Sequence, residues 1–95
     1  MLQRAVVMDE TVETRRKRLR FRSWHRGTRE LDLLLGRFAD QHMADLTTEQ
    51  LDRYEALIDQ PDPDIYRWLS GGEAPPEAHD TDVLNMIKNI KVKIE

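Results

Sequence analysis

The 95 residues of the chain suffice for one domain with one modest hydrophobic core, and they exclude a deep substrate cavity. With 39% apolar and 35% charged residues, and no apolar run near the ~20 residues of a membrane span, the composition is that of a soluble domain with a solvated surface. The absence of cysteine excludes disulfides, thiolate ligands and a cysteine nucleophile, and the net charge of -3 divides into +5 over residues 1–37 and -8 over residues 38–95.

This charge asymmetry has two interpretations. The basic part of the chain could steer and orient an acidic partner, because complementary fields accelerate and align encounters. Alternatively, the basic part could pair with the acidic part of the same chain, which would leave little charge for a partner. The sequence favours neither interpretation over the other.

We expect residues 1–8 to be disordered and residues 9–95 to form a single helical domain. The first helix is predicted over residues 11–24, with Asp9 or Thr11 as its N-cap and with arginines in its later turns. Its apolar residues form a thin stripe: Val12, Leu19, Phe21 and Trp24. We expect this stripe to pack on the core while the arginines face outward; whether the tryptophan is core or an exposed anchor stays open.

The second helix is predicted to begin at Gly27 and to continue to about residue 42. Its apolar positions recur at helical spacing: Leu31, Leu34, Leu35, Phe38 and His42. Gly36 lies in the interior of this helix, where glycine costs about 1 kcal/mol relative to alanine. Such a glycine predicts close contact with a neighbouring helix.

The third and fourth helices have clear boundary signals. Thr47 and Gln50 form a capping box at the start of the third helix, which Pro61 ends. For the fourth helix we predict Asp62 as the N-cap, Pro63 in the first position and Gly71-Gly72 at the end.

A loop over residues 73–79 precedes the last helix, which Asp80 is predicted to open. This helix carries apolar residues at helical spacing: Val83, Leu84, Ile87, Ile90 and Ile94. No strand pattern interrupts the helices. The sequence therefore predicts an all-α fold, a compact single-domain bundle of about five helices with short connections.

Catalytic and metal-binding signals are weak. The three histidines are far apart and lack the HExxH spacing of a zinc site, and the glycine-rich phosphate loops are absent. The pair Asp62 and Asp64 stands beside Pro63 at a helix start, which favours capping over metal binding. We therefore predict no catalytic residues and no metal site.

The segment over residues 15–29 is the strongest functional signal, because it holds nine basic residues, counting His25, and is followed by Glu30. In one interpretation Gly27 is only the turn between two helices and Glu30 caps the second helix at its N3 position. In the other, Gly27 leaves the turn open to a partner, and Arg26 offers a planar fork to a carboxylate, phosphate or carbonyl. Glu30 then binds a donor on that partner or fixes Arg26.

Two segments together resemble a known family. They are FRSWHRGTRELDLLLGRFA at residues 21–39 and DPDIYRWLSG at residues 62–71. They are similar to the FAD assembly factors called SdhE in bacteria and succinate dehydrogenase assembly factor 2 in mitochondria. The resemblance covers residues 19–72 and includes the family's RGxxE motif.

The resemblance implies a chaperone-like protein without catalytic activity. It would bind the flavoprotein subunit of succinate dehydrogenase, and in some bacteria of fumarate reductase, and assist covalent attachment of FAD to that subunit. FAD would belong to the partner, with no cofactor bound stably by this chain. The residues expected to bind the partner are Arg22, His25, Arg26, Gly27, Glu30 and Asp32.

Nucleic-acid binding is the alternative function. The basic helix over residues 15–29 could contact phosphates, with Phe21, Trp24 and His25 available for stacking on bases. The acidic excess of the rest of the chain opposes this interpretation, because it would repel the nucleic-acid backbone. We further expect a bacterial, cytoplasmic protein that is monomeric when free and does not insert into a membrane.

Overall fold

The computed structural model describes residues 10–91, and within this range it contains five α-helices, two short 3₁₀-helices and no strand. The α-helices are α2 (Val12–Trp24), α3 (Arg29–His42), α4 (Thr48–Ile58), α5 (Asp62–Ser70) and α6 (Asp82–Lys91). The 3₁₀-helices, η1 (Met43–Asp45) and η2 (Glu77–His79), were not predicted. The predicted all-α class and number of helices are confirmed. The predicted disorder of residues 1–8 lies outside the described residues.

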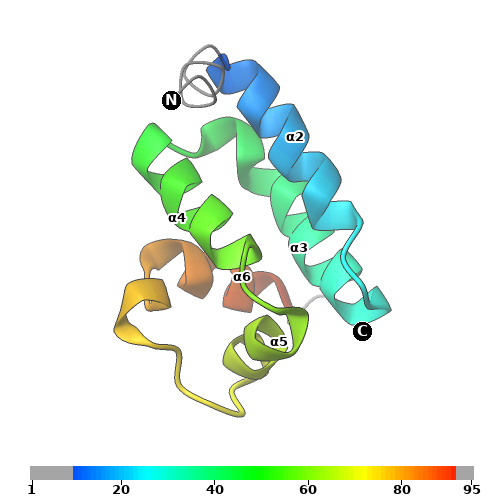
Figure 1. Cartoon of the computed structure of the whole chain (residues 1–95), viewed down its shortest axis with the longest axis vertical. Helices are drawn as coiled ribbons and strands as arrows, with labels where there is room; N and C mark the ends of the chain where they lie inside the picture. The colour runs from blue at the N-terminus through cyan, green and yellow to red at the C-terminus, as the bar shows by residue number, and fades with distance from the viewer. Residues whose placement is uncertain (1–9, 92–95) are drawn as a thin grey trace, which may run out of the picture.

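Helices α2 and α3 form an antiparallel pair along the length of the molecule, and α4 lies beside α2 (Figure 1). Helix α6 packs against α3, α4 and α5, so it closes the core. Most apolar positions on α3 to α6 are buried in one continuous cluster: Leu31, Leu34, Leu35, Phe38, Leu51, Tyr54, Leu57, Ile58, Ile65, Trp68, Leu69, Val83, Leu84, Ile87 and Ile90. Of the predicted positions, His42 is only half-buried, and Ile94 lies outside the described residues.

Several predicted helix boundaries are confirmed by their hydrogen bonds. The Thr11 hydroxyl accepts the Thr14 N–H at 3.0 Å, and Thr47 and Gln50 make both bonds of the predicted capping box. Gly71 ends α5 with a φ of 86°, a left-handed conformation that glycine adopts without steric cost. These boundaries depend on residues within one helical turn, and such residues are visible in the sequence.

Three predicted helix starts are wrong. Helix α3 begins at Arg29 rather than Gly27, because the Thr28 hydroxyl accepts the Leu31 N–H and caps the helix. Helix α5 has Pro61, not Asp62, at the N-cap position and no side-chain cap. Helix α6 begins two residues after Asp80, where the hydroxyl of the intervening threonine accepts the N–H of Leu84.

The apolar stripe predicted on α2 is only partly buried. Leu19 is fully buried, whereas Val12 and Phe21 are 43% and 63% exposed. The second buried residue of α2 is Ser23, whose hydroxyl donates to the Leu19 carbonyl and shares a hydrogen bond with the buried Tyr54 hydroxyl. Burial raises the pKa of that tyrosine, so it stays protonated and can donate to Ser23.

Gly36 makes the close contact predicted from its place in the helix interior. A Cβ atom at this position would lie 2.3–2.6 Å from three ring atoms of Trp24, so the indole of α2 lies directly on the backbone of α3. The Trp24 Nε1 donates to Asp40 at 3.2 Å. Trp24 is thus a half-buried packing residue between the two helices, which resolves the question left open by the sequence.

Replacing Gly36 with alanine should destabilise the protein by about 1–3 kcal/mol, although alanine is the better helix former. The added methyl group can fit only if the Trp24 indole moves away. Urea denaturation followed by far-ultraviolet circular dichroism measures the free energy of unfolding. As a control, Gly72→Ala should be nearly neutral, since its nearest contact would be at 3.6 Å. A Gly36→Ala variant as stable as the wild type would contradict this packing.

Candidate functional site

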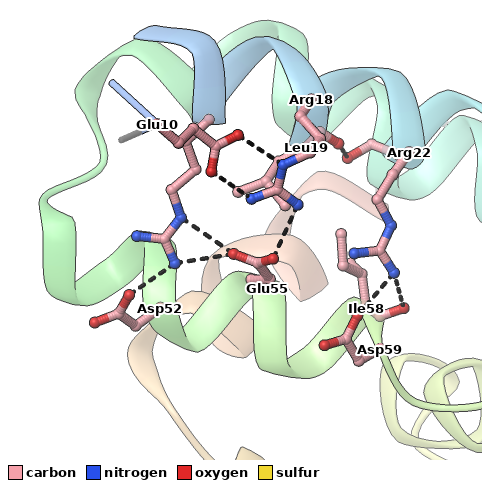
Figure 2. A network of polar contacts seen from close by, with 10 residues as sticks. Glu10, Arg18, Leu19, Arg22, Asp52, Glu55, Ile58 and Asp59 are labelled. Atoms are coloured by element: carbon pink, nitrogen blue, oxygen red, sulfur yellow. Dashed lines mark hydrogen bonds and ion pairs between the residues drawn. The ribbon is translucent and has the colours of Figure 1, made fainter. Parts of the chain in front are cut away.

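The arginines of α2 point mainly at acidic residues of the same chain. Figure 2 shows the Arg18 guanidinium between the carboxylates of Glu10 and Glu55, at 2.8 and 2.9 Å. Arg15 donates to Glu55 and to Asp52, the latter at 2.7 Å. The hydrogen bond from Arg18 and the charges of Arg18 and Arg15 lower the pKa of Glu10, although desolvation opposes them. The network attaches α2 to α4.

The same pattern continues along α2. Arg20 pairs with Asp40 on α3, and Arg16 donates to two backbone carbonyls near η1. Six of the eight arginines and lysines between residues 15 and 29 bond within the chain; among the residues described, the side chains of Lys17 and Arg29 have no such partner. Intramolecular pairing is therefore the correct interpretation of the charge asymmetry for most of this segment.

Arg26 is also paired within the chain. Its guanidinium donates to Asp62 Oδ1 at 2.7 and 3.1 Å, and its side chain is only 10% exposed. The sequence suggested that Arg26 could present a planar fork to a partner. In the structure its guanidinium does not point to a free surface in this way. The guanidinium is turned toward the start of α5 and is occupied there.

Gly27 completes this arrangement, because its N–H donates to Asp62 Oδ2 at 2.9 Å. A Cβ atom on Gly27 would lie 3.1 Å from the same oxygen, so a side chain would crowd the carboxylate. We call these contacts of Asp62 with Arg26 and Gly27 the Asp62 bridge. The close approach that the glycine permits is therefore made by this chain's own carboxylate.

The electrostatics of Asp62 reflect these contacts. Desolvation alone would raise the pKa of its carboxyl group, but the Gly27 N–H and the Arg26 guanidinium outweigh it. The pKa of Asp62 therefore lies below its ordinary value, and the carboxylate is ionised at neutral pH. Asp32, one of the predicted site residues, accepts the Arg26 backbone N–H at 2.6 Å and so also helps to fix the turn.

Glu30 is exposed and unpaired, like the adjacent Arg29 and unlike Arg26. It occupies the second position of α3, not the N3 position, and no other residue among 10–91 bonds to its carboxylate. It does not fix Arg26, since Asp62 does so. The exposed turn, residues 27–30, thus presents one free carboxylate.

Of the two remaining predicted site residues, Arg22 lies in the last turn of α2 and His25 is the C-cap residue that follows this helix. Arg22 donates to Asp59 at 2.8 Å and is engaged within the chain. His25 is exposed, with its Nδ1 at 2.7 Å from the Phe21 carbonyl and its ring stacked on the Phe21 ring at 3.9 Å. The six predicted residues are therefore brought to one end of the α2–α3 pair. Their role in partner binding stays a prediction.

A groove of about 360 Å³ adjoins the exposed turn between the N-terminal ends of α3 and α5. It is lined by Thr28, Glu30, Leu31, Asp62, Pro63 and Tyr66. Sequence reasoning missed the α5 side of this groove, because Asp62 was expected to cap its own helix. One signal was available in the sequence: the two segments that resemble the family, 21–39 and 62–71, occur together, and both line this groove.

Two kinds of site can be checked directly in the described part of the chain, a metal site and a membrane-spanning helix. Residues 10–91 contain no group of three or more histidine, aspartate or glutamate side chains suited to a metal ion. Among the helices described, none is long and apolar enough to cross a membrane. The predicted pair Asp62 and Asp64 is divided between two arginines, Arg26 and Arg67.

Comparison with known proteins identifies relatives along most of the chain. A family model described as "Flavinator of succinate dehydrogenase" matches residues 17–91. The mitochondrial succinate dehydrogenase assembly factor 2 of the yeast Meyerozyma guilliermondii is 42% identical over 83 residues, which are 83% of this chain and 62% of that protein. The FAD assembly factor SdhE of Acetobacter pasteurianus is 35% identical over 88 residues, 92% of this chain and 81% of that protein.

These relatives correct the expected location. Proteins of a yeast, of Dictyostelium discoideum and of Drosophila mojavensis, at 40–42% identity, are named as mitochondrial, and the bacterial relative is less similar. The prediction of a bacterial cytoplasmic protein is therefore wrong. The absence of cysteine does not by itself distinguish between compartments. The chain spans 52–62% of the length of these three mitochondrial relatives.

Substituting Asp62 with asparagine should cost roughly 1–3 kcal/mol of stability at neutral pH, because it removes a carboxylate bonded to Arg26 and Gly27. The folded-state pKa of Asp62 lies below its unfolded value, so its contribution is complete above about pH 5 and is lost as the pH falls through the folded pKa. The difference in unfolding free energy between wild type and Asp62→Asn should therefore shrink below about pH 4. Urea denaturation at a series of pH values measures it; a difference that stays constant down to pH 3 would contradict the Asp62 bridge.

Proposed function

The chain belongs to the family of flavinators of succinate dehydrogenase, and from this membership we propose that it is an assembly factor for the flavoprotein subunit of that enzyme. It binds the subunit and promotes covalent attachment of FAD. The observation that carries the proposal is the match of residues 17–91, which includes both the exposed turn and the α5 side of the groove. Neither the comparisons nor the structure supports the nucleic-acid-binding alternative.

The role we propose is chaperone-like and not catalytic. The groove beside the exposed turn is lined by the carboxylates of Glu30 and Asp62, which repel the pyrophosphate of FAD. The guanidinium of Arg26, which contacts Asp62 of the lining, is already paired with that carboxylate. FAD therefore stays with the partner, and the covalent bond forms in the partner's own site.

Binding assists the reaction by selecting one conformation of the flavoprotein. A protein that binds one conformation raises its population by no more than its differential affinity for that conformation. The Asp62 bridge keeps the turn rigid, so little conformational entropy is lost when a partner binds there. In this mechanism Asp62, Arg26 and Asp32 position the turn, and Glu30 contacts the partner.

Two further properties belong to the same proposal. The flavoprotein of fumarate reductase is a second client, since it shares the FAD chemistry. The free protein is a monomer, because the described part of the chain exposes only three large apolar side chains and they form no single patch: Val12 and Phe21 stand nine residues apart on α2, and Tyr66 is on α5.

The first test of this function is a flavinylation assay with Glu30→Ala. Incubation of the flavoprotein subunit with FAD and this chain should yield covalent flavin, measured by fluorescence of the denatured subunit. Glu30→Ala should lower the rate about five-fold or more, because it removes the free carboxylate of the turn. The variant should unfold like the wild type, since Glu30 bonds to no other described residue.

Glu49→Ala is the matched control. Glu49 occupies the equivalent second position of α4, is exposed, and lies away from the turn. It should support flavinylation at the wild-type rate. Arg26→Ala is less informative, because it leaves Asp62 without its charged partner and lowers stability as well. Equal rates for the Glu30 and Glu49 variants would refute the contact role of Glu30.

A further inference from the structure

We propose that the groove between α3 and α5 receives one cationic side chain, arginine or lysine, of the flavoprotein partner. Its charged end pairs with Glu30, and its aliphatic stem lies along Pro63 and Tyr66. This inference rests on the proposed function and deepens it, because it names the chemistry that the partner must present. It also assigns a binding role to α5, which the RGxxE motif does not include.

The charges of the groove lining support a cation. Of its two carboxylates, Asp62 is compensated by Arg26 at 2.7 Å, whereas Glu30 has no counterion within residues 10–91. The nearby Asp64 is paired with Arg67. The positive ends of α3 and α5 do not reverse this balance, because each first turn carries two acidic residues. The lining residues together with Arg26 therefore carry one net negative charge, while the unpaired Arg29 precedes Glu30 in the sequence but is not part of the lining.

The apolar part of the groove supports a long side chain. Leu31 is buried at 1% exposure and forms part of the lining, while Tyr66 is 45% exposed and flanks it. Arginine and lysine pack their aliphatic stems along such surfaces and keep the charged end at the rim. A guanidinium or ammonium group also binds favourably over the face of a tyrosine ring. Tyr66 thus flanks the stem of the bound side chain, close to the charged end that Glu30 binds.

Other occupants fit the groove less well. An anionic group would be repelled by Glu30 and by the ionised Asp62. A purely apolar side chain would desolvate Glu30 without giving it a partner, which costs free energy. The other strongly exposed aromatic residue among those described, Phe21, stacks on His25 and does not line the groove beside Glu30, so it does not offer the same combination.

The experiment measures the dissociation constant of this chain for the purified succinate dehydrogenase flavoprotein subunit. Glu30→Gln and Tyr66→Leu should each weaken binding about ten-fold or more, because one removes the charge and the other the aromatic face. Tyr66→Phe should bind within about two-fold of the wild type, since it keeps the ring. Binding of the wild type should weaken with added salt more steeply than binding of Glu30→Gln.

Two matched controls separate these effects from general surface changes. Glu49→Gln removes an exposed carboxylate at the equivalent position of α4, and Phe21→Leu removes the other exposed aromatic ring. Both should bind like the wild type. A charge-swap test identifies the partner residue that pairs with Glu30. Glu30→Arg should abolish binding, and one arginine-to-glutamate or lysine-to-glutamate substitution in the flavoprotein should restore it.

The outcomes distinguish this inference from the proposed function. If the wild type binds and promotes flavin attachment while Glu30→Gln and Tyr66→Leu match their controls, the groove is not the contact and only the inference is overturned. Loss of binding in Tyr66→Phe would likewise overturn it, because the hydroxyl and not the ring would then be required. If the wild type neither binds the flavoprotein nor promotes flavin attachment, the proposed function and the inference fall together.

Discussion

The Asp62 carboxylate is the interaction on which the functional end of this molecule depends. It accepts from the Arg26 guanidinium with one oxygen and from the Gly27 N–H with the other, across 35 residues of sequence. These bonds join the turn between α2 and α3 to the start of α5. Without them the turn would have only Asp32 and the helix cap to fix it, and the groove would lose one wall.

Ion pairs within the chain also account for most of its charge asymmetry. The basic helix α2 is attached to α3 and α4 by ion pairs at Asp40, Asp52, Glu55 and Asp59, so the large charge asymmetry is used mostly within the fold. Individually such partly exposed pairs contribute little, but Glu55 joins two arginines into a network. The carboxylate of Glu30, at the exposed turn, takes no part in this pairing.

The sequence predicted what depends on neighbouring residues and missed what depends on distant ones. The capping box at Thr47 and the packing role of Gly36 were predicted because helical spacing and backbone propensity carry them locally. Asp62 was misassigned as a cap, since an aspartate before proline has the same local pattern whether it caps its helix or binds a distant turn. The pairing of α2 with α4 also needs the register between two helices, which no local pattern contains.

The central claim is that the exposed turn and the start of α5, not the basic face of α2, meet the flavoprotein. Hydrogen–deuterium exchange of this chain, alone and bound to the flavoprotein subunit, tests it most directly, because backbone amides report burial at each segment. We predict slower exchange on binding over residues 27–31 and 62–66, with residues 15–22 unchanged. Slower exchange confined to residues 15–22, with none at the turn, would contradict the account.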